Sequence, residues 1–335
     1  MLGSLLGTAV GDALGLPYEG VPRRRVAAFG TVRHRFCFGR GMFSDDTEHT
    51  LMLAASIISH RQDPAAMQRA FARRLRWWLV ALPAGVGLST AKAIVRLWLE
   101  FPAARGGVAS AGNGAAMRSA VVGVAYKDDS GNRHAMALAA CRVTHTDPRA
   151  EESAILVAEA AGLAANAIAT EEVVSVLEAL VTSEEMKTRF AALKVALAAK
   201  VTVSDYAARI GCERGVSGFA PNTVAVALFA WLRHRGQFEP ALRSVIECGG
   251  DTDTISAITG GICGAETGEQ GIPPEWLNGI CDWPRSVQHL RDVAAALESG
   301  ATTVPRLFWP AILPRNVFFL AVVLLHGFRR LLPPY

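Results

Sequence analysis

The sequence predicts an all-α protein, and three observations carry this prediction. Apolar residues recur three or four positions apart through most of the chain, which is the spacing of one helix face. No segment alternates apolar and polar residues over the length of a strand, and no short repeat is present. Glycine, proline and helix-capping residues separate the apolar segments. With 335 residues, 51% of them apolar and 19% charged, the chain is long enough to bury a sizeable core.

The first predicted helix covers residues 2–16 and carries a row of glycines. Gly3, Gly7 and Gly11 lie four positions apart and therefore on one face of the helix. Because glycine has no side chain, the backbone of a second helix can approach this face closely.

Two acids near the end of this helix are candidate functional residues. Asp12 interrupts an apolar stretch, and a buried carboxylate needs a partner or a metal ion. Pro17 ends the helix, and Glu19 follows in a loop. Taken alone, Glu19 is typical of a surface carboxylate.

An acidic cluster begins the next predicted helix. Residues 21–43 are expected to form a loop, after which Ser44 or Asp45 starts a helix that runs to about residue 60. Ser44, Asp45 and Asp46 have the side chains that cap helix N-termini. Carboxylate and hydroxyl oxygens are also the ligands that Mg²⁺, Mn²⁺ and Ca²⁺ prefer. Both interpretations are open at this point.

A similar cluster begins a helix about two hundred residues later. Asp251, Asp253 and Thr254 follow the paired glycines 249–250 and lead into an apolar helix that ends near residue 266. We expect the two acidic clusters to meet in space around metal.

A glycine turn marks a candidate phosphate site. Gly112-Asn113-Gly114 precedes a helix predicted over 115–122, where backbone N–H groups and the helix dipole favour an anion. The turn is neither a Walker loop nor a dinucleotide fingerprint. Further along, His145 precedes a helix start at Pro148, and its ring is either a local hydrogen-bonding group or a ligand contact.

The other predicted helices follow the same spacing rule. They cover residues 64–81, 89–99, 149–169, a segment starting at 170, 184–200, 204–210, 221–236, 238–248, 277–281 and 286–298.

The tail, residues 301–335, differs in character from the rest of the chain. Three prolines punctuate a linker, and residues 316–325 are almost wholly apolar. This segment is shorter than the ~20 apolar residues that span a bilayer, so no transmembrane segment is expected. We expect this segment to form a helix that packs on this chain or on a second copy. The alternative is that residues 316–332 form an interfacial or partner-binding helix.

Charge and cysteine content exclude several classes of protein. The net charge of +4 is small, and the basic residues are scattered, so no nucleic-acid footprint is evident. Six cysteines lie far apart without a zinc-type spacing, and no signal peptide opens the chain. We expect a soluble cytoplasmic protein with reduced thiols.

With these segments placed, the chain resembles the ADP-ribosylglycohydrolase family, which includes the enzyme that removes ADP-ribose from dinitrogenase reductase. The resemblance covers residues 1–300 and leaves 301–335 outside as a linker and a C-terminal apolar helix. The motifs occur in family order: Gly-Asp-Ala-Leu-Gly at 11–15 with Pro17-Tyr18-Glu19, Ser-Asp-Asp-Thr at 44–47, Gly-Asn-Gly-Ala-Ala-Met-Arg at 112–118, Thr-His-Thr at 144–146 and Gly-Gly-Asp-Thr-Asp-Thr at 249–254.

The resemblance implies a compact orthogonal helical bundle with a centre of two Mg²⁺ or Mn²⁺ ions. It assigns metal ligation to Ser44, Asp45, Asp46, Asp251, Asp253 and Thr254. Two divalent cations would compensate the repulsion among the acids. Asp12 would then support the ligands from behind.

The resemblance also implies the reaction, hydrolysis of the bond between ADP-ribose and a protein side chain or small acceptor. Glu19 would be the base, assisted by Asp45 or Asp46. Ser110, Gly112, Asn113 and Gly114 would hold the diphosphate and ribose, and His145 would line the nucleotide pocket. Ala111 stands where some relatives carry an aromatic residue.

Two other functions are alternatives to this one. The same metal site is suited to another nucleotide or phosphoester substrate. A catalytically silent relative would keep the fold for binding or structure, but the intact acids argue against that interpretation.

Overall fold

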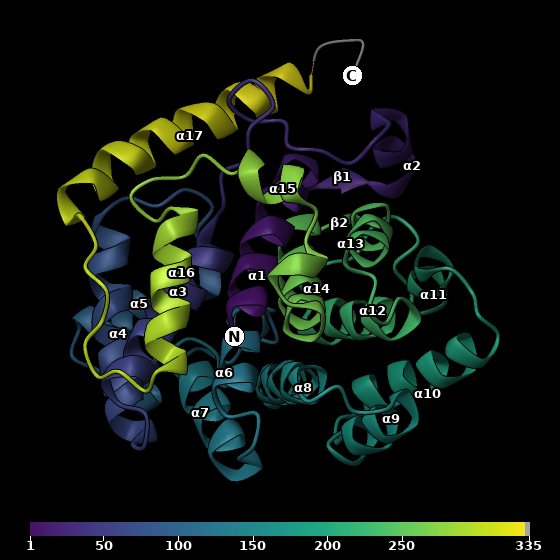
Figure 1. Ribbon diagram of the computed structural model, residues 1–335, viewed down its shortest axis with the longest axis horizontal. Coiled ribbons are helices and arrows are strands. Elements are labelled where there is room, and N and C mark those ends of the chain that lie inside the picture. The colour runs from purple at the N-terminus through teal and green to yellow at the C-terminus, as the bar shows by residue number, and fades with distance from the viewer. Residues whose placement is uncertain (332–335) are drawn as a thin grey trace.

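The computed structural model describes residues 1–331 as an assembly of helices around one core, which confirms the all-α prediction (Figure 1). The helices are α1 (Leu2–Gly15), α2 (Arg23–Val26), α3 (Asp45–Ser59), α4 (Pro64–Val80), α5 (Leu88–Trp98), α6 (Ala120–Ala125), α7 (Ser130–Arg142), α8 (Pro148–Ala165), α9 (Thr170–Ala179), α10 (Glu184–Ala198), α11 (Val203–Arg209), α12 (Ala220–Arg233), α13 (Phe238–Ile246), α14 (Thr252–Thr267), α15 (Pro274–Gly279), α16 (Val287–Glu298) and α17 (Ile312–Arg329).

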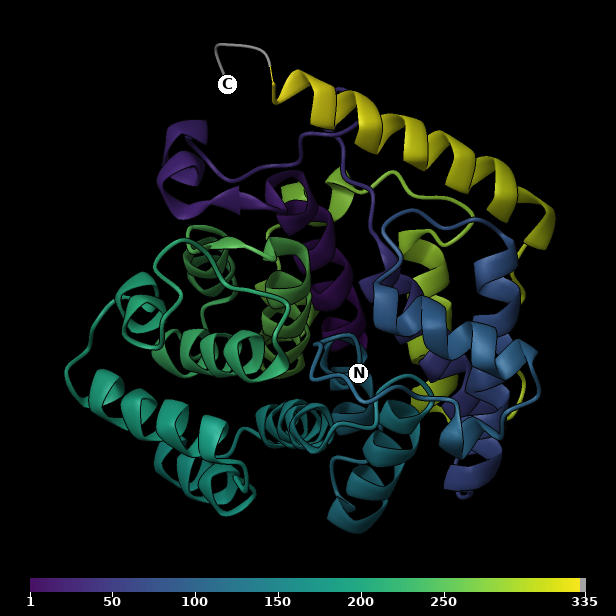
Figure 2. The same ribbon diagram turned by 180° about the vertical axis from the view of Figure 1, so that it is seen from behind.

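The glycine row of α1 packs against α14 in the middle of the molecule (Figures 1 and 2). A Cβ atom added at Gly7 would lie 2.1 Å from the carbonyl oxygen of Gly260, and one at Gly3 would lie 2.2 Å from that of Gly264. These distances are far shorter than any van der Waals contact, so only glycine permits this approach. The close backbone approach expected from the sequence is therefore present.

The antiparallel packing of α1 and α14 brings the end of one helix beside the start of the other. Thr252, the first residue of α14, donates a hydrogen bond from Oγ1 to the carbonyl of Gly15, the last residue of α1, at 2.8 Å. Because Asp12 and Glu19 flank the end of α1, this register places them next to the Asp251–Thr254 segment.

A two-stranded antiparallel sheet fixes the same junction. Strand β1 (Val21–Pro22) pairs with β2 (Gly249–Gly250), with Val21 opposite Gly250. Both glycines have positive φ, and a Cβ on Gly250 would lie 2.1 Å from the carbonyl oxygen of Val216. The prediction of no strand was wrong here, because two-residue strands are too short to show an alternating pattern.

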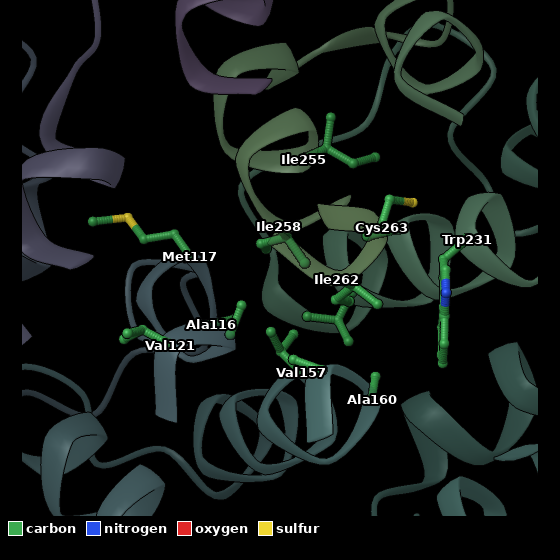
Figure 3. Close-up of a cluster of buried hydrophobic side chains, with 14 of the residues drawn as sticks. Ala116, Met117, Val121, Val157, Ala160, Trp231, Ile255, Ile258, Ile262 and Cys263 are labelled. Atoms are coloured by element: carbon green, nitrogen blue, oxygen red, sulfur yellow. The ribbon is translucent and has the colours of Figure 1, made fainter. Parts of the chain in front are cut away.

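One contiguous core holds the helices together. Figure 3 shows part of it, with Met117 and Val121 on one side and Val157 of α8 and Ile258 and Ile262 of α14 on the other. The residues predicted as a helix over 115–122 instead form a 3₁₀ turn at Ala116–Arg118 before α6. Helix α7, over 130–142, was not predicted, since its apolar residues form only a weak stripe.

The C-terminal helix α17 lies across the outside of the bundle (Figures 1 and 2). It is longer than the apolar segment predicted at 316–325, and Leu332 of the proposed association segment lies outside the described residues. By length and composition alone, Trp309–Arg329 is the one helix in the described chain that could cross a membrane. The division of the chain at residue 300 stays a prediction.

A buried ion-pair network fastens α17 to the bundle. Arg315 donates hydrogen bonds to Asp282, to Glu48 at 3.0 Å and to the carbonyl of Phe43 at 2.7 Å. Glu48 also pairs with Arg285 at 2.7 Å, and all four charged side chains are buried. Since Glu48 lies in the first turn of α3, the network reaches the back of the Ser44–Asp46 cluster.

Candidate metal and substrate site

Asp12 fixes the start of α3 from the neighbouring helix. Its buried carboxylate accepts hydrogen bonds from the backbone N–H groups of Ser44 and Thr47 at 2.9 and 3.1 Å, and from the Thr47 hydroxyl at 2.6 Å. Burial raises the pKa of Asp12 to about 6, although these hydrogen bonds lower it. Asp12 therefore accepts hydrogen bonds from N–H groups that have no partner within α3. In this position it supports the acids at the start of α3.

Ser44 and Asp46 form the first half of the candidate metal site. Ser44 is the N-cap of α3, and its hydroxyl donates to Asp46 Oδ2 at 3.1 Å. Asp46 is buried, whereas Asp45, the first residue of α3, is half-buried. Ser44 thus has the capping position that the sequence allows, and its hydroxyl also contacts the acidic cluster.

The second half lies at the start of α14. The hydroxyl of Thr254 donates to Asp46 Oδ2 at 3.4 Å and so joins the two halves. Asp251 is the N-cap of α14 but makes no capping hydrogen bond with its side chain, and Asp253 is buried in the first turn. The structure therefore brings together residues that are about two hundred positions apart in sequence.

The acids of this cluster carry oxygen atoms without partners. Asp46 Oδ1 and Asp253 Oδ1 are buried and accept no hydrogen bond. Burial raises the pKa of Asp45, Asp46 and Asp253 well above their usual range, and neighbouring carboxylates raise it further. Unpaired carboxylate oxygens under mutual repulsion are stabilised by a cation.

This donor set fits a hard divalent cation. Within residues 1–331, no three His, Cys, Asp or Glu side chains form a group that by itself could hold a metal ion. The hydroxyls of Ser44 and Thr254, together with water, would therefore complete a coordination shell. Oxygen-only shells that include water are usual for Mg²⁺ and Mn²⁺.

Glu19 lies at the edge of the cluster, where its side chain is only partly exposed to solvent. The loop that carries it is held to the α14 start by a hydrogen bond from Gly20 N–H to the Gly250 carbonyl at 2.7 Å. Partial burial raises the pKa of Glu19, the charge of Asp251 raises it further, and Arg330 lowers it. A carboxylate with raised basicity beside the acids is suited to accept a proton.

Asn113 connects the glycine turn to the acidic cluster. Its Nδ2 donates to Asp251 Oδ2 at 2.7 Å and to Thr223 Oγ1 at 3.1 Å. In the same turn, Ser110 Oγ accepts from the N–H of Gly112 at 3.3 Å. The residues expected to bind diphosphate and ribose are therefore adjacent to the acids.

His145 packs against this glycine turn. A Cβ atom on Gly114 would lie 3.0 Å from the His145 ring, and one on Gly112 would lie 3.3 Å from it. The ring nitrogen Nδ1 bonds to Thr144 Oγ1 at 2.8 Å. Burial, with a further contribution from Arg118, lowers the pKa of His145 to about 3, so the ring is neutral at physiological pH.

Arg118 is a residue to which the sequence analysis gave no role. Its fully buried guanidinium donates to the carbonyl of Gly114 at 2.5 Å and to the Thr144 hydroxyl at 2.7 Å. It thereby holds the glycine turn and the His145 loop together. The signal in the sequence is an arginine four residues after Gly114 in an otherwise apolar segment.

A well-formed cavity lies away from these residues. It measures about 390 Å³ and is bounded by α3, α16 and the linker, with Arg74, Arg285 and His289 among its lining residues. No carboxylate lines it, so it is not the acidic site. The position of the acids, rather than cavity size, identifies the candidate site.

These features form a candidate acidic site built from helix starts, and comparison with known proteins shows the family to which the chain belongs. The sequence pattern of the ADP-ribosylglycohydrolase family matches residues 1–305, so the chain belongs to this family and is an ADP-ribosyl glycohydrolase. The family named from the five motifs is thereby confirmed.

Individual relatives extend over most of the chain. An uncharacterized protein of Archaeoglobus fulgidus is 34% identical and covers 83% of this chain and 90% of its own length. The ADP-ribosylarginine hydrolase Tri1 of Pseudomonas putida is 26% identical, covering 91% of this chain and 79% of its own. A solved structure described as an ADP-ribosylglycohydrolase-related protein complex has a TM-score of 0.70 and 28% identity, covering 90% of this chain and 97% of its own.

Proposed function

We propose that the protein uses two divalent cations, Mg²⁺ or Mn²⁺, to hydrolyse the N- or O-glycosidic bond that joins ADP-ribose to a protein side chain or small acceptor. The observation that carries the proposal is the pair of unpartnered carboxylate oxygens, Asp46 Oδ1 and Asp253 Oδ1, at adjoining helix starts. Ser44, Asp45 and Asp46 would hold cations from one side, and Asp251, Asp253 and Thr254 from the other. When bound, the cations supply Lewis acidity that orients the ribose hydroxyls and acidifies water.

Glu19 would act as the general base. A water oxygen attacks the anomeric carbon, Glu19 takes a proton from that water, and the bond to the acceptor breaks. The acceptor leaves with a proton, and ADP-ribose is released. Asp45 and Asp46 assist because their negative charge favours the positive charge that develops at the anomeric carbon.

The glycine turn would hold the nucleotide part of the substrate. Backbone N–H groups near Gly112 and Gly114 suit the diphosphate, and the Asn113 side chain links this subsite to Asp251. Because His145 is neutral, it would line the nucleotide pocket and form a hydrogen bond, and it would not supply a positive charge to the diphosphate.

An arginine-linked substrate is the first to test. The acidic cluster favours a cationic leaving group such as guanidinium, and Tri1, the relative described above, is named for ADP-ribosylarginine. We also propose a cytoplasmic location, which agrees with the six free cysteines in the described chain.

The function is tested by product analysis with the purified full-length protein. Metal-stripped protein is given Mn²⁺ and an arginine-ADP-ribosylated protein, a serine-linked one and O-acetyl-ADP-ribose, and the products are separated chromatographically. We expect free ADP-ribose, with turnover abolished by EDTA and restored by Mn²⁺. Release of AMP or ribose phosphate instead would support the phosphoester alternative, and release that is unaffected by EDTA would refute the metal scheme.

Metal binding should stabilise the protein more at high pH. The raised pKa of Asp12, about 6, means that the folded state retains a proton that the unfolded chain loses near pH 4. The metal-free protein therefore loses stability as pH rises from about 4 to 6. A cation must displace protons from the acids, so we expect the increase in Tm on adding Mn²⁺ to be larger at pH 8 than at pH 5. An equal or smaller increase at pH 8 would contradict binding at these acids.

A further inference from the structure

The polarity of helix α17 is inverted relative to that of an ordinary surface helix. Its polar residues Arg315, Asn316 and His326 face the protein. Asn316 donates to the carbonyl of Ala81 at 2.7 Å, and a ring nitrogen of His326 bonds to the carbonyl of Pro17 at 2.9 Å. Just beyond the helix, Arg330 donates to the carbonyl of Glu19 at 2.9 Å.

The outward face of α17 is apolar. Among residues 312–329, every exposed residue except Arg329 is apolar or glycine: Leu313, Pro314, Val317, Phe318, Leu320, Ala321, Leu324, Leu325, Gly327 and Phe328. At 100° per residue these positions cover roughly half of the helix circumference. A soluble helix normally shows the opposite pattern. Figures 1 and 2 show α17 as an outermost element of the molecule.

Aromatic side chains extend this apolar face at the start of α17. Trp283, Phe308 and Trp309 are each about half exposed, and the rings of Trp283 and Phe308 lie 5.9 Å apart. Exposed tryptophans beside an apolar face are typical of the boundary between water and lipid.

Exposed arginines accompany the apolar face. Residues 301–335 contain no aspartate or glutamate and four arginines, one of which, Arg315, is buried in the ion pairs described above. At the C-terminal end of α17, Arg25 of α2 donates to the carbonyl of Arg330 at 3.5 Å, and Arg24, Arg25 and Arg329 are exposed. The surface around the apolar face is therefore complementary to negative charge.

We propose that the outward face of α17 docks on an anionic phospholipid bilayer, with the helix lying in the plane of the interface. The apolar side chains would enter the boundary between headgroups and acyl chains, and the arginines would contact anionic headgroups. This property goes beyond the hydrolase activity and lies outside the part of the chain that the family pattern covers.

The contacts of α17 argue against a membrane-spanning helix. Arg315 is buried in ion pairs with Asp282 and Glu48. Insertion of the helix across a bilayer would break both pairs and leave Asp282 without its ion-pair partner in the protein.

The chemistry of the face argues against a second protein as the occupant. Protein interfaces carry about one hydrogen bond for every 100–200 Å², and this face presents no hydrogen-bonding side chain except Arg329. The same face of a second copy would also bring no acid to pair with the exposed arginines.

Vesicle flotation with the full-length protein tests the proposal. Vesicles of phosphatidylcholine alone are compared with vesicles that also contain phosphatidylglycerol. We expect partitioning onto the anionic vesicles about 10-fold or more above that onto the neutral ones, falling as salt is raised. Leu324→Asp with Phe328→Asp should reduce partitioning about 10-fold or more, because both side chains lie on the outward face.

Val195→Asp is the matched control. Val195 is an equally exposed apolar residue, 63% accessible, but lies on α10. The Val195→Asp change should leave partitioning of the protein onto anionic vesicles unchanged, and light scattering should show the same monomeric mass for all variants. Equal binding of the wild type to neutral vesicles, no binding to either, resistance to carbonate extraction, or a dimer that the Leu324→Asp change disrupts would each overturn the proposal.

Discussion

Replacing Asp253 with asparagine is expected to lower kcat for ADP-ribose release by about 1,000-fold or more. Asparagine keeps the shape of the side chain but removes the negative charge, and its amide nitrogen cannot ligate a cation. The buried Oδ1 of Asp253 has no hydrogen-bond partner within the protein, so this oxygen makes no contact that stabilises the fold. Turnover is measured with saturating substrate and Mn²⁺.

A stability measurement separates this role from a structural one. Burial and the charges of Glu19, Asp251 and Asp46 raise the pKa of Asp253, so the charged form is disfavoured in the metal-free protein. Asp253→Asn should therefore raise the Tm of the metal-free protein at pH 8 and abolish its increase with Mn²⁺. Asp128→Asn, at an exposed acid outside the cluster, should change neither value. A lower metal-free Tm for Asp253→Asn would show that the acid supports the fold instead.

The acidic cluster could be predicted in outline, because residue type left capping and metal ligation open for Asp46 and the family resemblance favoured metal ligation. Two carboxylates in the first turns of apolar helices need a compensating positive charge, which a cation bound by their oxygen atoms would provide. Sequence could also predict the helices and the close approach at Gly7, since both follow from local spacing. The way the two halves are joined, through Thr254 and Asp46, depends on tertiary packing and was expected only in outline.

The parts that were missed depend on contacts between distant residues. The pairing of Val21 with Gly250 joins segments about 230 positions apart and leaves no periodic signal in either. Arg118 and Arg315 are single arginines in apolar segments, and only the folded chain shows which carbonyls and carboxylates they reach. The inverted polarity of α17 follows from Arg315, because a buried arginine turns the polar side of the helix inward.

Replacing Gly260 with alanine is expected to destabilise the fold by about 3 kcal/mol or more. The new Cβ atom would lie 2.1 Å from the carbonyl oxygen of Gly7. Because this oxygen belongs to the backbone of α1, no side-chain rotation can relieve the contact. Helices α1 and α14 must then separate. Because Asp12 of α1 holds the start of α3, this separation moves Asp253 of α14 away from Asp46. The free energy of unfolding is measured by urea denaturation, and the increase of Tm with Mn²⁺ should shrink in parallel.

Gly327→Ala provides the matched control, since it makes the same change within helix α17 where nothing lies within 4 Å of the added atom. Alanine has the higher helix propensity, so this variant should be unchanged or more stable by about 0.5–1 kcal/mol. If Gly260→Ala behaved like Gly327→Ala, the separation between α1 and α14 would have to be larger than the structure shows. Loss of stability with an undiminished Mn²⁺ response would instead mean that the two halves of the acidic cluster are held together by contacts other than this helix pair.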